Sequence, residues 1–335
     1  MLSHLIGDMI GSRYESTRNK NPGVPLWGND CVMTDDSMMT LAVAQWKLQA
    51  LNPDQPDYQW VRGATFEHPG PWMMDLGRRH TERGFGASFV QWLRRGNPQA
   101  AYGSWGNGAV MRVGGLAALA SSMDEALHWA KESVSPTHEH PSSVQGAQAV
   151  VWGIRRAFEL KAQHGCAVAA RGAWLDEFMA LWGPSGTMVK ENEAYYPDVR
   201  SWSLEIIREE HDFDVSTQGT VPLAFFIAGK TKSFEEAMDA CVSIGGDADT
   251  LACIVAGFVE GFDGWPEAYV ERAFRKQEWW FDPEWQEIVK AWVEAPTVQQ
   301  FYVSFGRSLP PVQAWWQAGP DMNNRFHGWH PQAPV

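Results

Sequence analysis

Residues 34–50 read TDDSMMTLAVAQWKLQA, and a related pattern returns at residues 243–257 as SIGGDADTLACIVAG. After its acidic start, each stretch is almost continuously apolar and rich in Ala and Leu, a composition that favours a buried α-helix. Strand signals are few, because β-branched residues lie mostly inside such Ala-rich runs. The sequence therefore predicts an all-α fold, with roughly ten helices packed as a single compact domain. The clearest helical segments are 34–50, 108–120, 143–162, 221–229 and 247–262.

Two parts of the chain stand apart from the helical body, which we place at residues 1–264. Residues 183–217 are polar and turn-rich, so we expect a long loop or insertion there. Residues 265–335 form a C-terminal extension that carries eight of the 19 tryptophans. So many large apolar rings are costly to leave in water, and they would pack either on a partner or on the chain itself. Because large aromatic residues are usually core residues, we expect the extension to pack on the body.

The cysteines and the apolar runs indicate the compartment. Cys31, Cys166, Cys241 and Cys253 are scattered, with no CxxC pair and no zinc-like spacing,. They are typical of small buried side chains in a reducing compartment. The apolar N-terminal stretch is interrupted by Asp8 and lacks a basic leader, and no run approaches the roughly 20 apolar residues of a membrane helix. We therefore expect a cytoplasmic protein that does not enter a membrane.

The charge of the chain is strongly negative, at −13 from 27 Lys and Arg against 40 Asp and Glu. This balance disfavours binding to the phosphate backbone of nucleic acids. Acidity spread over the surface serves solubility, whereas carboxylates gathered at one place hold cations. The local pattern of the acidic residues has to decide between these interpretations.

The first acidic pair is Asp35 and Asp36, which follow Thr34 at the start of an apolar helical run. Helix capping is the simpler interpretation, because Thr and Asp are good N-caps and carboxylates favour the positive end of the helix dipole. Capping needs only one acid per helix, however, and a second acidic pair elsewhere weakens this interpretation.

The second pair is Asp247 and Asp249, which lie between two glycines and Thr250 at the start of another apolar run. Gly245 and Gly246 let the backbone approach a ligand closely, and alternate carboxylates in the next turn can point at a common centre. Four carboxylates at the starts of two buried helices are costly to bury unless cations compensate for them. The two pairs together therefore predict a metal site.

A fifth acid, Glu15, lies just beyond a glycine-containing segment and is able to reach the same centre, although a solvated surface glutamate is the alternative. All the proposed ligands are oxygens, which favours Mg²⁺, with Mn²⁺ as a substitute, over zinc. Asp35, Asp36, Asp247, Asp249 and Glu15 together carry five negative charges. Two divalent ions leave this set nearly neutral, so we expect a dinuclear centre.

With these residues in hand, the sequence resembles the ADP-ribosylglycohydrolase family, which includes the dinitrogenase reductase-activating glycohydrolase of bacteria and the vertebrate ADP-ribosylhydrolases. The resemblance covers most of residues 4–264 through six ordered blocks: GDMIGSRYE, TDDSMMTLAVA, GSWGNGAVMRVGGLA, SPTHEHPSSVQGAQAV, GTVPLAFFIA and SIGGDADTLACIVAGFVEG. It implies an all-helical fold with a pair of Mg²⁺ or Mn²⁺ ions. The metal ligands that it implies are Thr34, Asp35, Asp36, Asp247, Asp249, Thr250 and Glu15, the last by similarity to the serine-directed vertebrate member.

The block GSWGNGAVMR resembles a loop that holds ADP-ribose. The small and polar members of this loop are suited to bind phosphate and ribose through backbone amides and one side-chain amide; they are Gly103, Ser104, Gly106, Asn107 and Gly108. Trp105 either stacks on the adenine or belongs to the core, and these alternatives are equally weighted. His138 matches a family histidine near the phosphates or ribose, although a lone histidine is often structural, and His140 is a weaker candidate.

The activity implied by the resemblance is hydrolysis of the glycosidic bond of ADP-ribose attached to a protein side chain or another acceptor. Cleavage passes through an oxocarbenium-like state, and two ions would bind the ribose hydroxyls and activate a water. Asp35, Asp36 and Glu15 are the candidate catalytic carboxylates, and sequence does not choose the general base among them. Asp249 is our expected bridging ligand.

Other functions stay open at this point. A metal-dependent phosphoesterase also needs an acidic two-ion site, but such sites typically include histidine ligands, which this set lacks. A non-catalytic ADP-ribose-binding protein or a structural protein on the same fold is the main alternative. The partner is an ADP-ribosylated protein or a small-molecule conjugate, within a transferase or toxin system, and the linkage is through arginine, serine, an acetyl ester or a nucleobase.

Overall fold

Helix α12 (Ala248–Asp263) lies at the centre of the molecule, and every residue from Ala248 to Phe262 is buried. Helices α1, α7, α10 and α11 make most of its contacts, and α8 and α2 also touch it. A helix that is apolar on all sides needs such a complete shell of neighbours. The acidic turn at the start of α12 is therefore carried into the interior of the protein.

The computed structural model describes residues 1–52, 67–98, 101–186, 196–280 and 282–323. These residues form sixteen α-helices and four short 3₁₀ helices. The α-helices are α1 (Leu2–Ser12), α2 (Asp35–Leu51), α3 (Gly70–Arg79), α4 (Ala87–Arg95), α5 (Leu116–Leu119), α6 (Met123–Val134), α7 (Pro141–His164), α8 (Ala167–Trp182), α9 (Leu204–Glu210), α10 (Thr217–Lys230), α11 (Phe234–Val242), α12, α13 (Glu267–Phe274), α14 (Pro283–Glu294), α15 (Pro296–Ser304) and α16 (Val312–Gln317). The 3₁₀ helices are η1 (Glu15–Thr17), η2 (Asn107–Ala109), η3 (Val199–Ser201) and η4 (Gln277–Trp280).

Helices α1 and α12 touch backbone to backbone because two glycines of α1 face small residues of α12. A Cβ atom placed on Gly7 would lie 2.2 Å from the carbonyl oxygen of Ala252, and one on Gly11 would lie 2.3 Å from that of Ala248. No side chain larger than hydrogen fits at either position without moving a helix. This close approach brings the acids of α1 and α12 into one neighbourhood.

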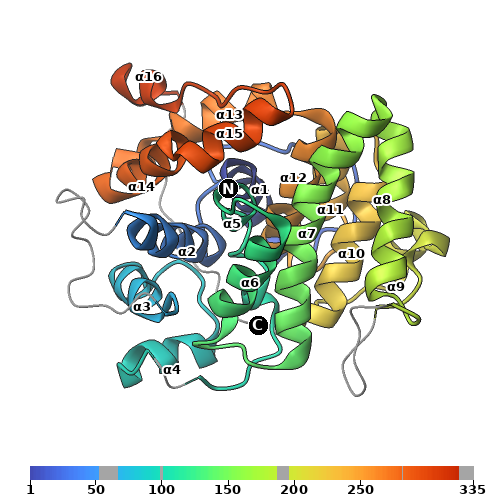
Figure 1. Cartoon of the computed structure of the whole chain (residues 1–335), viewed down its shortest axis with the longest axis horizontal. Coiled ribbons are helices and arrows are strands. Elements are labelled where there is room, and N and C mark those ends of the chain that lie inside the picture. The colour runs from blue at the N-terminus through green and yellow to red at the C-terminus, as the bar shows by residue number, and fades with distance from the viewer. Residues whose placement is uncertain (53–66, 99–100, 187–195, 281, 324–335) are drawn as a thin grey trace.

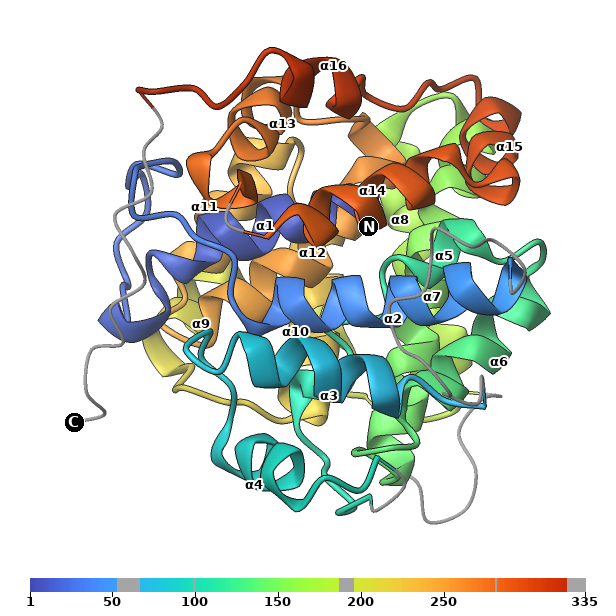
Figure 2. The same ribbon diagram turned by 90° about the vertical axis from the view of Figure 1, so that its left-hand side faces the viewer.

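Helix α2 crosses the front of the molecule in Figure 2, with α3 below it and α14 above it. Its residues from Asp36 to Leu48 are buried, so α2 is a second nearly enclosed helix. The C-terminal helices α13 to α16 gather at one end of the view in Figure 1. Within this group, α14 packs on α2, α15 on α5, and α13 on α1.

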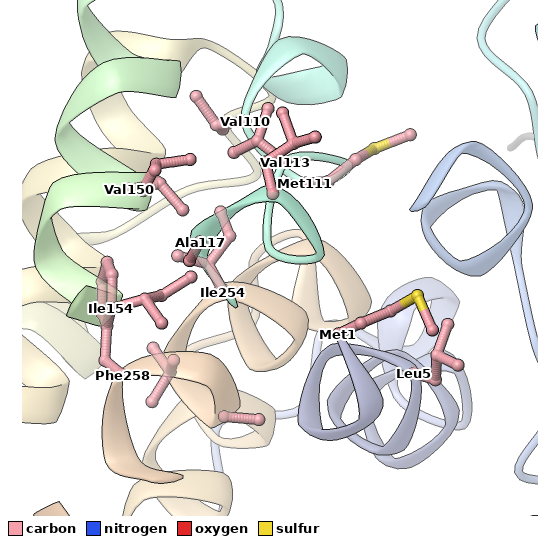
Figure 3. Packing of buried hydrophobic residues seen from close by; sticks show 14 of the residues in the cluster. Met1, Leu5, Val110, Met111, Val113, Ala117, Val150, Ile154, Ile254 and Phe258 are labelled. Atoms are coloured by element: carbon pink, nitrogen blue, oxygen red, sulfur yellow. The ribbon is translucent and has the colours of Figure 1, made fainter. Parts of the chain in front are cut away.

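The apolar core joins the N-terminal and central helices. Val150 and Ile154 of α7 face Ile254 and Phe258 of α12 in Figure 3. All four are nearly or fully buried, and the cluster continues to the side chains of α1 and of the segment before α5. Burial of large aliphatic and aromatic side chains of this kind stabilises a fold by about 1.5–3 kcal/mol each.

The predicted all-α fold in one domain is confirmed, with corrections in detail. The described residues contain more helices than we expected, because several are short. Four of the predicted helices agree with α2, α7, α10 and α12. Segment 108–120 does not: it contains only η2 and the one-turn α5, with turns between them. At Gly114, within one of these turns, a Cβ would lie 2.1 Å from the ring of His4, so the turn leaves room only for glycine there.

Strands play almost no part in the fold. Among the described residues, the only β-type pairing is an isolated antiparallel bridge between Gly106 and Ser216. In the same part of the chain, no helix combines the length and the apolar character that crossing a membrane requires.

The two segments that we set apart have structure of their own. The described part of 183–217 includes η3 and α9, and residues 187–195 lie outside the described residues. In the C-terminal extension, Trp279, Trp285 and Trp292 are completely buried, whereas Trp329 lies outside the described residues. The proposed boundary at residue 264 stays a prediction.

Candidate metal centre

Three helices deliver carboxylates to one buried place. Asp8 of α1, Asp36 of α2 and Asp249 of α12 form one group, and each offers an oxygen within 4.8 Å of the others. Glu15 and Asp247 form a second group with the same Asp249, under the same distance limit. Asp249 therefore belongs to both groups, which is the arrangement expected of a residue between two ions.

Asp8 is the residue that sequence reasoning missed, and it caps α2 from outside that helix. Its carboxylate accepts hydrogen bonds from the backbone amides of Thr34, at 2.9 Å, and Ser37, at 3.0 Å. It also accepts from both hydroxyl groups, with Thr34 Oγ1 at 2.6 Å and a close contact from Ser37 Oγ. The signal was a single acid inside the apolar run of residues 2–10, which we interpreted only as an interruption.

Because Asp8 supplies the cap, the acids of α2 are free for another role. Thr34 is the N-cap residue, but its side chain makes no capping hydrogen bond and donates to Asp8 instead. The Asp35 amide donates to the carbonyl oxygen of Arg83 at 2.7 Å. Asp36 accepts a hydrogen bond on Oδ2 from Thr250 Oγ1 at 3.2 Å. The capping interpretation of Asp35 and Asp36 is therefore wrong for their carboxylates.

Electrostatics indicate a cluster that needs cations. Desolvation, followed by the charges of neighbouring carboxylates, raises the pKa of Asp35, Asp36 and Asp249 well above the usual range. Burial raises the pKa of Asp247 to about 6. The charge of Asp249 is the largest cause that raises the pKa of Glu15 to about 8, and burial adds to it. A divalent ion would reverse these effects by stabilising the charged carboxylates.

One buried oxygen makes the fit to a cation specific. Asp36 Oδ1 is buried and has no hydrogen-bond partner among the described residues. An unpaired carboxylate oxygen inside a protein is costly, and a bound cation would remove that cost. With only oxygen donors around it, the cluster fits a hard ion such as Mg²⁺ or Mn²⁺.

The predicted ligands are distributed unevenly over this centre. Asp36, Asp247, Asp249 and Glu15 belong to the two close groups, whereas Asp35 is a half-buried neighbour that belongs to neither. Thr34 and Thr250 lie at its edge, where their hydroxyls donate to Asp8 and Asp36. The glycine turn before α12 holds the left-handed conformation, with φ of 79° at Gly245, which suits glycine,.

Asn107 connects the acids to the glycine loop, residues 103–108. Its Nδ2 donates to Asp247 Oδ2 at 2.6 Å and to Thr220 Oγ1 at 3.2 Å. We expected this side chain to hold the nucleotide, yet its amide hydrogens point at an acid and a hydroxyl. Thr220, on α10, is a second residue that the sequence did not single out.

The rest of the glycine loop is fixed by its backbone against the start of α10. The Asn107 amide donates to the Val215 carbonyl at 2.8 Å, and the Thr217 amide donates to the Trp105 carbonyl at 3.0 Å. Thr217 Oγ1 also donates to the Gly106 carbonyl at 2.8 Å. Ser104 is bonded at its carbonyl by Ser143 Oγ at 3.0 Å. The loop is therefore rigid before any ligand arrives.

Trp105 projects from this rigid loop into solvent. Its side chain is 53% exposed, which excludes the alternative that it is a core residue. Gly103, two residues before Trp105, has a φ of 64°, and a Cβ placed on it would meet nothing within 4 Å. An exposed indole on a rigid loop is free to stack on a planar ligand.

His138 lies beneath the glycine loop. Cβ atoms placed on Gly108 and Gly106 would approach its Nε2 to 3.3 and 3.7 Å. On its other side, Nδ1 lies 2.7 Å from Thr137 Oγ1, which also accepts from Arg112 Nη2 at 3.0 Å. Burial and the Arg112 charge lower the pKa of His138, so it is neutral at pH 7,. His140 caps α7 instead, by accepting from the Ser142 amide.

A hollow of about 470 Å³ opens between α9 and the start of α10, and the acids of the metal centre are not among its lining residues. His211, one of its lining residues, reaches the turn before α12, because a Cβ on Gly246 would lie 2.7 Å from its Nε2. Trp202, Glu210 and Asp214 also line it. No sequence motif indicated this hollow, since many of its residues fall in the segment 183–217 that we expected to be a loop or insertion, and the others lie on α10.

Comparisons with known proteins agree with this architecture. A sequence model of the family described as ADP-ribosylglycohydrolase matches residues 1–295. An uncharacterized protein of Archaeoglobus fulgidus is 27% identical over 169 residues, which are 49% of this chain and 52% of that protein. This chain therefore matches about half the length of that curated relative. A solved structure described as an ADP-ribosylglycohydrolase-related protein complex has a TM-score of 0.57 at 20% identity, over 89% of this chain and 95% of that one. At that identity the likeness concerns the fold alone.

Proposed function

This chain belongs to the ADP-ribosylglycohydrolase family, and on that premise we propose that it uses two Mg²⁺ ions, or Mn²⁺ in their place, to hydrolyse the bond between ADP-ribose and an acceptor. Family membership indicates a hydrolase of this type. The metal dependence, the linkage and the acceptor are parts of the proposal.

Two clusters of carboxylates that share Asp249 carry the proposal. Asp36, in one of these clusters, has a buried oxygen without a hydrogen-bond partner among the described residues. The residues that would hold the ions are Asp36, Asp249, Asp247, Glu15 and Asp35, with Thr34 and Thr250 completing the set. When bound, two such ions supply Lewis acidity and a water whose pKa is lowered toward about 7.

The chain's own groups divide the remaining work. Asp8 accepts four hydrogen bonds, so it positions α2 and is not available as a general base. Glu15, Asp35 and Asp36 remain the candidates for the base. Glu15 and Asp35 are only half-buried, which leaves them in reach of substrate and water,.

The glycine loop is the proposed binding site for the nucleotide part of the substrate. The amides of Ser104 and Gly106 already donate to the Thr137 carbonyl at 3.2 Å and to Ser104 Oγ at 3.1 Å. The amides of Gly103 and Gly108 are therefore the ones that we propose for phosphate or ribose oxygens. Trp105 would stack on the adenine, and His138 would contact the ligand from beneath the loop. Asn107, which donates to Asp247, would link binding at this loop to the acid centre.

The proposed substrate is an ADP-ribosylated protein or a small ADP-ribose conjugate. Arginine, serine, an acetyl ester and a nucleobase are all candidates for the group that is released, and a cognate transferase or ADP-ribosylating toxin would produce the substrate. The hollow beside α9 is where we place atoms of the substrate that extend beyond the acids.

The test measures free ADP-ribose released from a panel of these four linkages by protein that has been stripped with EDTA and dialysed. Mg²⁺ or Mn²⁺ should restore release, and zinc should not, because the site has only hard oxygen donors. Asp249→Ala serves as the inactive control. Release that persists without metal would overturn the metal-dependent mechanism, and binding of ADP-ribose without release of any of the four would favour a non-catalytic binding protein.

A further inference from the structure

We infer that Glu278, in the C-terminal extension, is a positioning residue for the metal centre: with Arg83 it fixes the backbone immediately before Asp35 and Asp36. This inference rests on the proposed function, because it assumes that these two acids contribute to binding the ions. No motif or resemblance that we used to assign the site includes Glu278 or Arg83.

The contact is a closed set of hydrogen bonds around Met33. The Met33 amide donates to Glu278 Oε1 at 3.2 Å, with Oε2 at 3.5 Å. The Met33 carbonyl accepts from Arg83 Nη1 at 2.8 Å, and the same Nη1 lies 3.2 Å from Glu278 Oε2. Both backbone polar groups of Met33 are thus held by one ion pair.

Arg83 also makes a contact two residues further along, at Asp35. Its own carbonyl accepts the Asp35 amide at 2.7 Å, and this amide is one of the helix-start donors that no residue of α2 can satisfy,. The segment that leads into α2 is therefore held by Glu278 and Arg83 at Met33 and Asp35, and by Asp8 at Thr34 and Ser37.

The pair is buried at a place where a simple stabilising role is a poor explanation. The Glu278 side chain is completely buried and that of Arg83 is 5% exposed, with its guanidinium 5.3 Å from the ring centre of Trp285. Burying two charges costs desolvation energy, and apolar residues of similar size are often at least as stabilising. What the charges provide here is directional bonding to a backbone segment that ends in two carboxylates.

The geometry explains why metal binding would depend on it. Ligand groups have to be held within about 0.5 Å of their working positions, and groups that orient ligands typically contribute about ten- to hundred-fold to metal affinity. Without Glu278, Met33 would lose the acceptor of its buried amide, and the turn that carries Asp35 and Asp36 would be free to shift.

The experiment compares Glu278→Gln with Glu260→Gln. Glu260 is also a fully buried glutamate in a hydrogen-bond network, with Ser3 and with Tyr302, whose hydroxyl lies 2.6 Å away, but it is near the far end of α12. The dissociation constant of Mn²⁺ is measured by calorimetric titration of the metal-free proteins, together with their melting temperatures. Glutamine offers one oxygen where the carboxylate uses two, so its NH2 group must face either the Met33 amide or Arg83 Nη1. We therefore expect Glu278→Gln to weaken Mn²⁺ binding about ten-fold or more, and Glu260→Gln to lower only the melting temperature.

The outcomes separate this inference from the proposed function. If the wild-type protein does not bind Mn²⁺, the proposed function is overturned. If the wild-type protein binds Mn²⁺ and the Glu278→Gln variant binds it equally tightly, only the role of Glu278 is overturned. Equal weakening in both variants would also overturn it, since that result would indicate a general loss of stability. If Glu278→Gln does not fold, Glu278→Asp decides: it keeps the charge for Arg83 but draws the acceptor away from Met33, and it should still weaken Mn²⁺ binding.

Discussion

The starts of α2 and α12 both carry two carboxylates and a threonine, but opposite surroundings hold them. At α2, the donors of the first turn meet acceptors from elsewhere: Asp8 takes the amides of Thr34 and Ser37, and Arg83 takes that of Asp35. At α12, the carboxylates of Asp247 and Asp249 face each other and Glu15.

The two helix starts therefore differ in how far the protein itself compensates their polar groups. The backbone donors of Thr34, Asp35 and Ser37 at the start of α2 are satisfied by the protein itself, so this turn can form without an ion even though Asp36 Oδ1 stays unpaired. The carboxylates at the start of α12 accept hydrogen bonds from the Asn107 side-chain amide and the Thr250 backbone amide, and neither donor carries a charge that would neutralise them. The two helices therefore predict different responses when a carboxylate is removed, although the sequence motifs look alike.

The largest effect is expected at α12. Asp249→Ala should abolish release of ADP-ribose, because this residue belongs to both carboxylate groups. The free energy of unfolding of the metal-free protein should not fall, since removing one of several repelling buried acids relieves strain. Activity assays and urea unfolding in EDTA check the two halves. An active variant, or one that is unfolded, would contradict the contrast.

Changing the pH of the metal-free protein should expose the same repulsion. Burial raises the pKa of Asp8 and of Asp247 from 3.8 to about 6, and the Asp249 charge together with burial raises the pKa of Glu15 from 4.5 to about 8. The folded state then binds more protons than the unfolded state between about pH 4 and 8, so stability is present at low pH and is lost as pH rises. Each titrating group contributes at most about 1.4 kcal/mol per pH unit.

Urea unfolding in EDTA at pH 5 and pH 8 measures this loss. Saturating Mg²⁺ should reduce it, because the ions favour the charged carboxylates. A metal-free protein that is more stable at pH 8 than at pH 5 would show that the carboxylates are compensated in some other way.

Removing the cap of α2 should act on stability first. Asp8→Ala leaves the buried amides of Thr34 and Ser37 without their acceptor, at about 1–3 kcal/mol each, so we expect a loss of about 3 kcal/mol in the free energy of unfolding. Asp8→Asn keeps one acceptor oxygen and should lose less. If Asp8→Ala is as stable as wild type in EDTA, Asp8 is not the cap that its hydrogen bonds indicate.

The smallest effects are expected in the glycine loop, where the structure revises our first interpretation. Asn107→Ala should lower kcat, at a cost of about 1.5–3 kcal/mol, because its amide donates to Asp247,. Trp105→Ala should weaken substrate binding by about 1 kcal/mol, the lower end of the range for base stacking on aromatic side chains. This loss should appear as a higher KM with kcat nearly unchanged. Its melting temperature should not change, since the ring is exposed. If the Asn107→Ala variant changes only KM, the role of Asn107 is nucleotide binding, as the sequence predicted.

The sequence predicted what depends on local pattern and missed what depends on contacts between helices. Continuous apolar runs located α2 and α12, and their acidic starts identified Asp36 and Asp249 as partners. Asp8 was missed because its role exists only once α1 lies against the start of α2. The single helix predicted at 108–120 was wrong, and the local pattern could not show that the ring of His4, far away in sequence, packs against Gly114 in the turn before α5.

The contact of Gly7 and Gly11 with α12 has a consequence for engineering this protein. Replacing helical glycine by alanine is a standard way to raise thermal stability, because alanine loses less backbone entropy on folding. At these two positions the added methyl group would collide with the carbonyl oxygens of Ala252 and Ala248, and the two helices would have to separate. Asp8 and Asp249 lie on those helices, so separating the helices would also change the spacing of the acids. Designs that optimise helix propensity at these two positions would therefore disturb the acid centre without the expected gain in thermal stability.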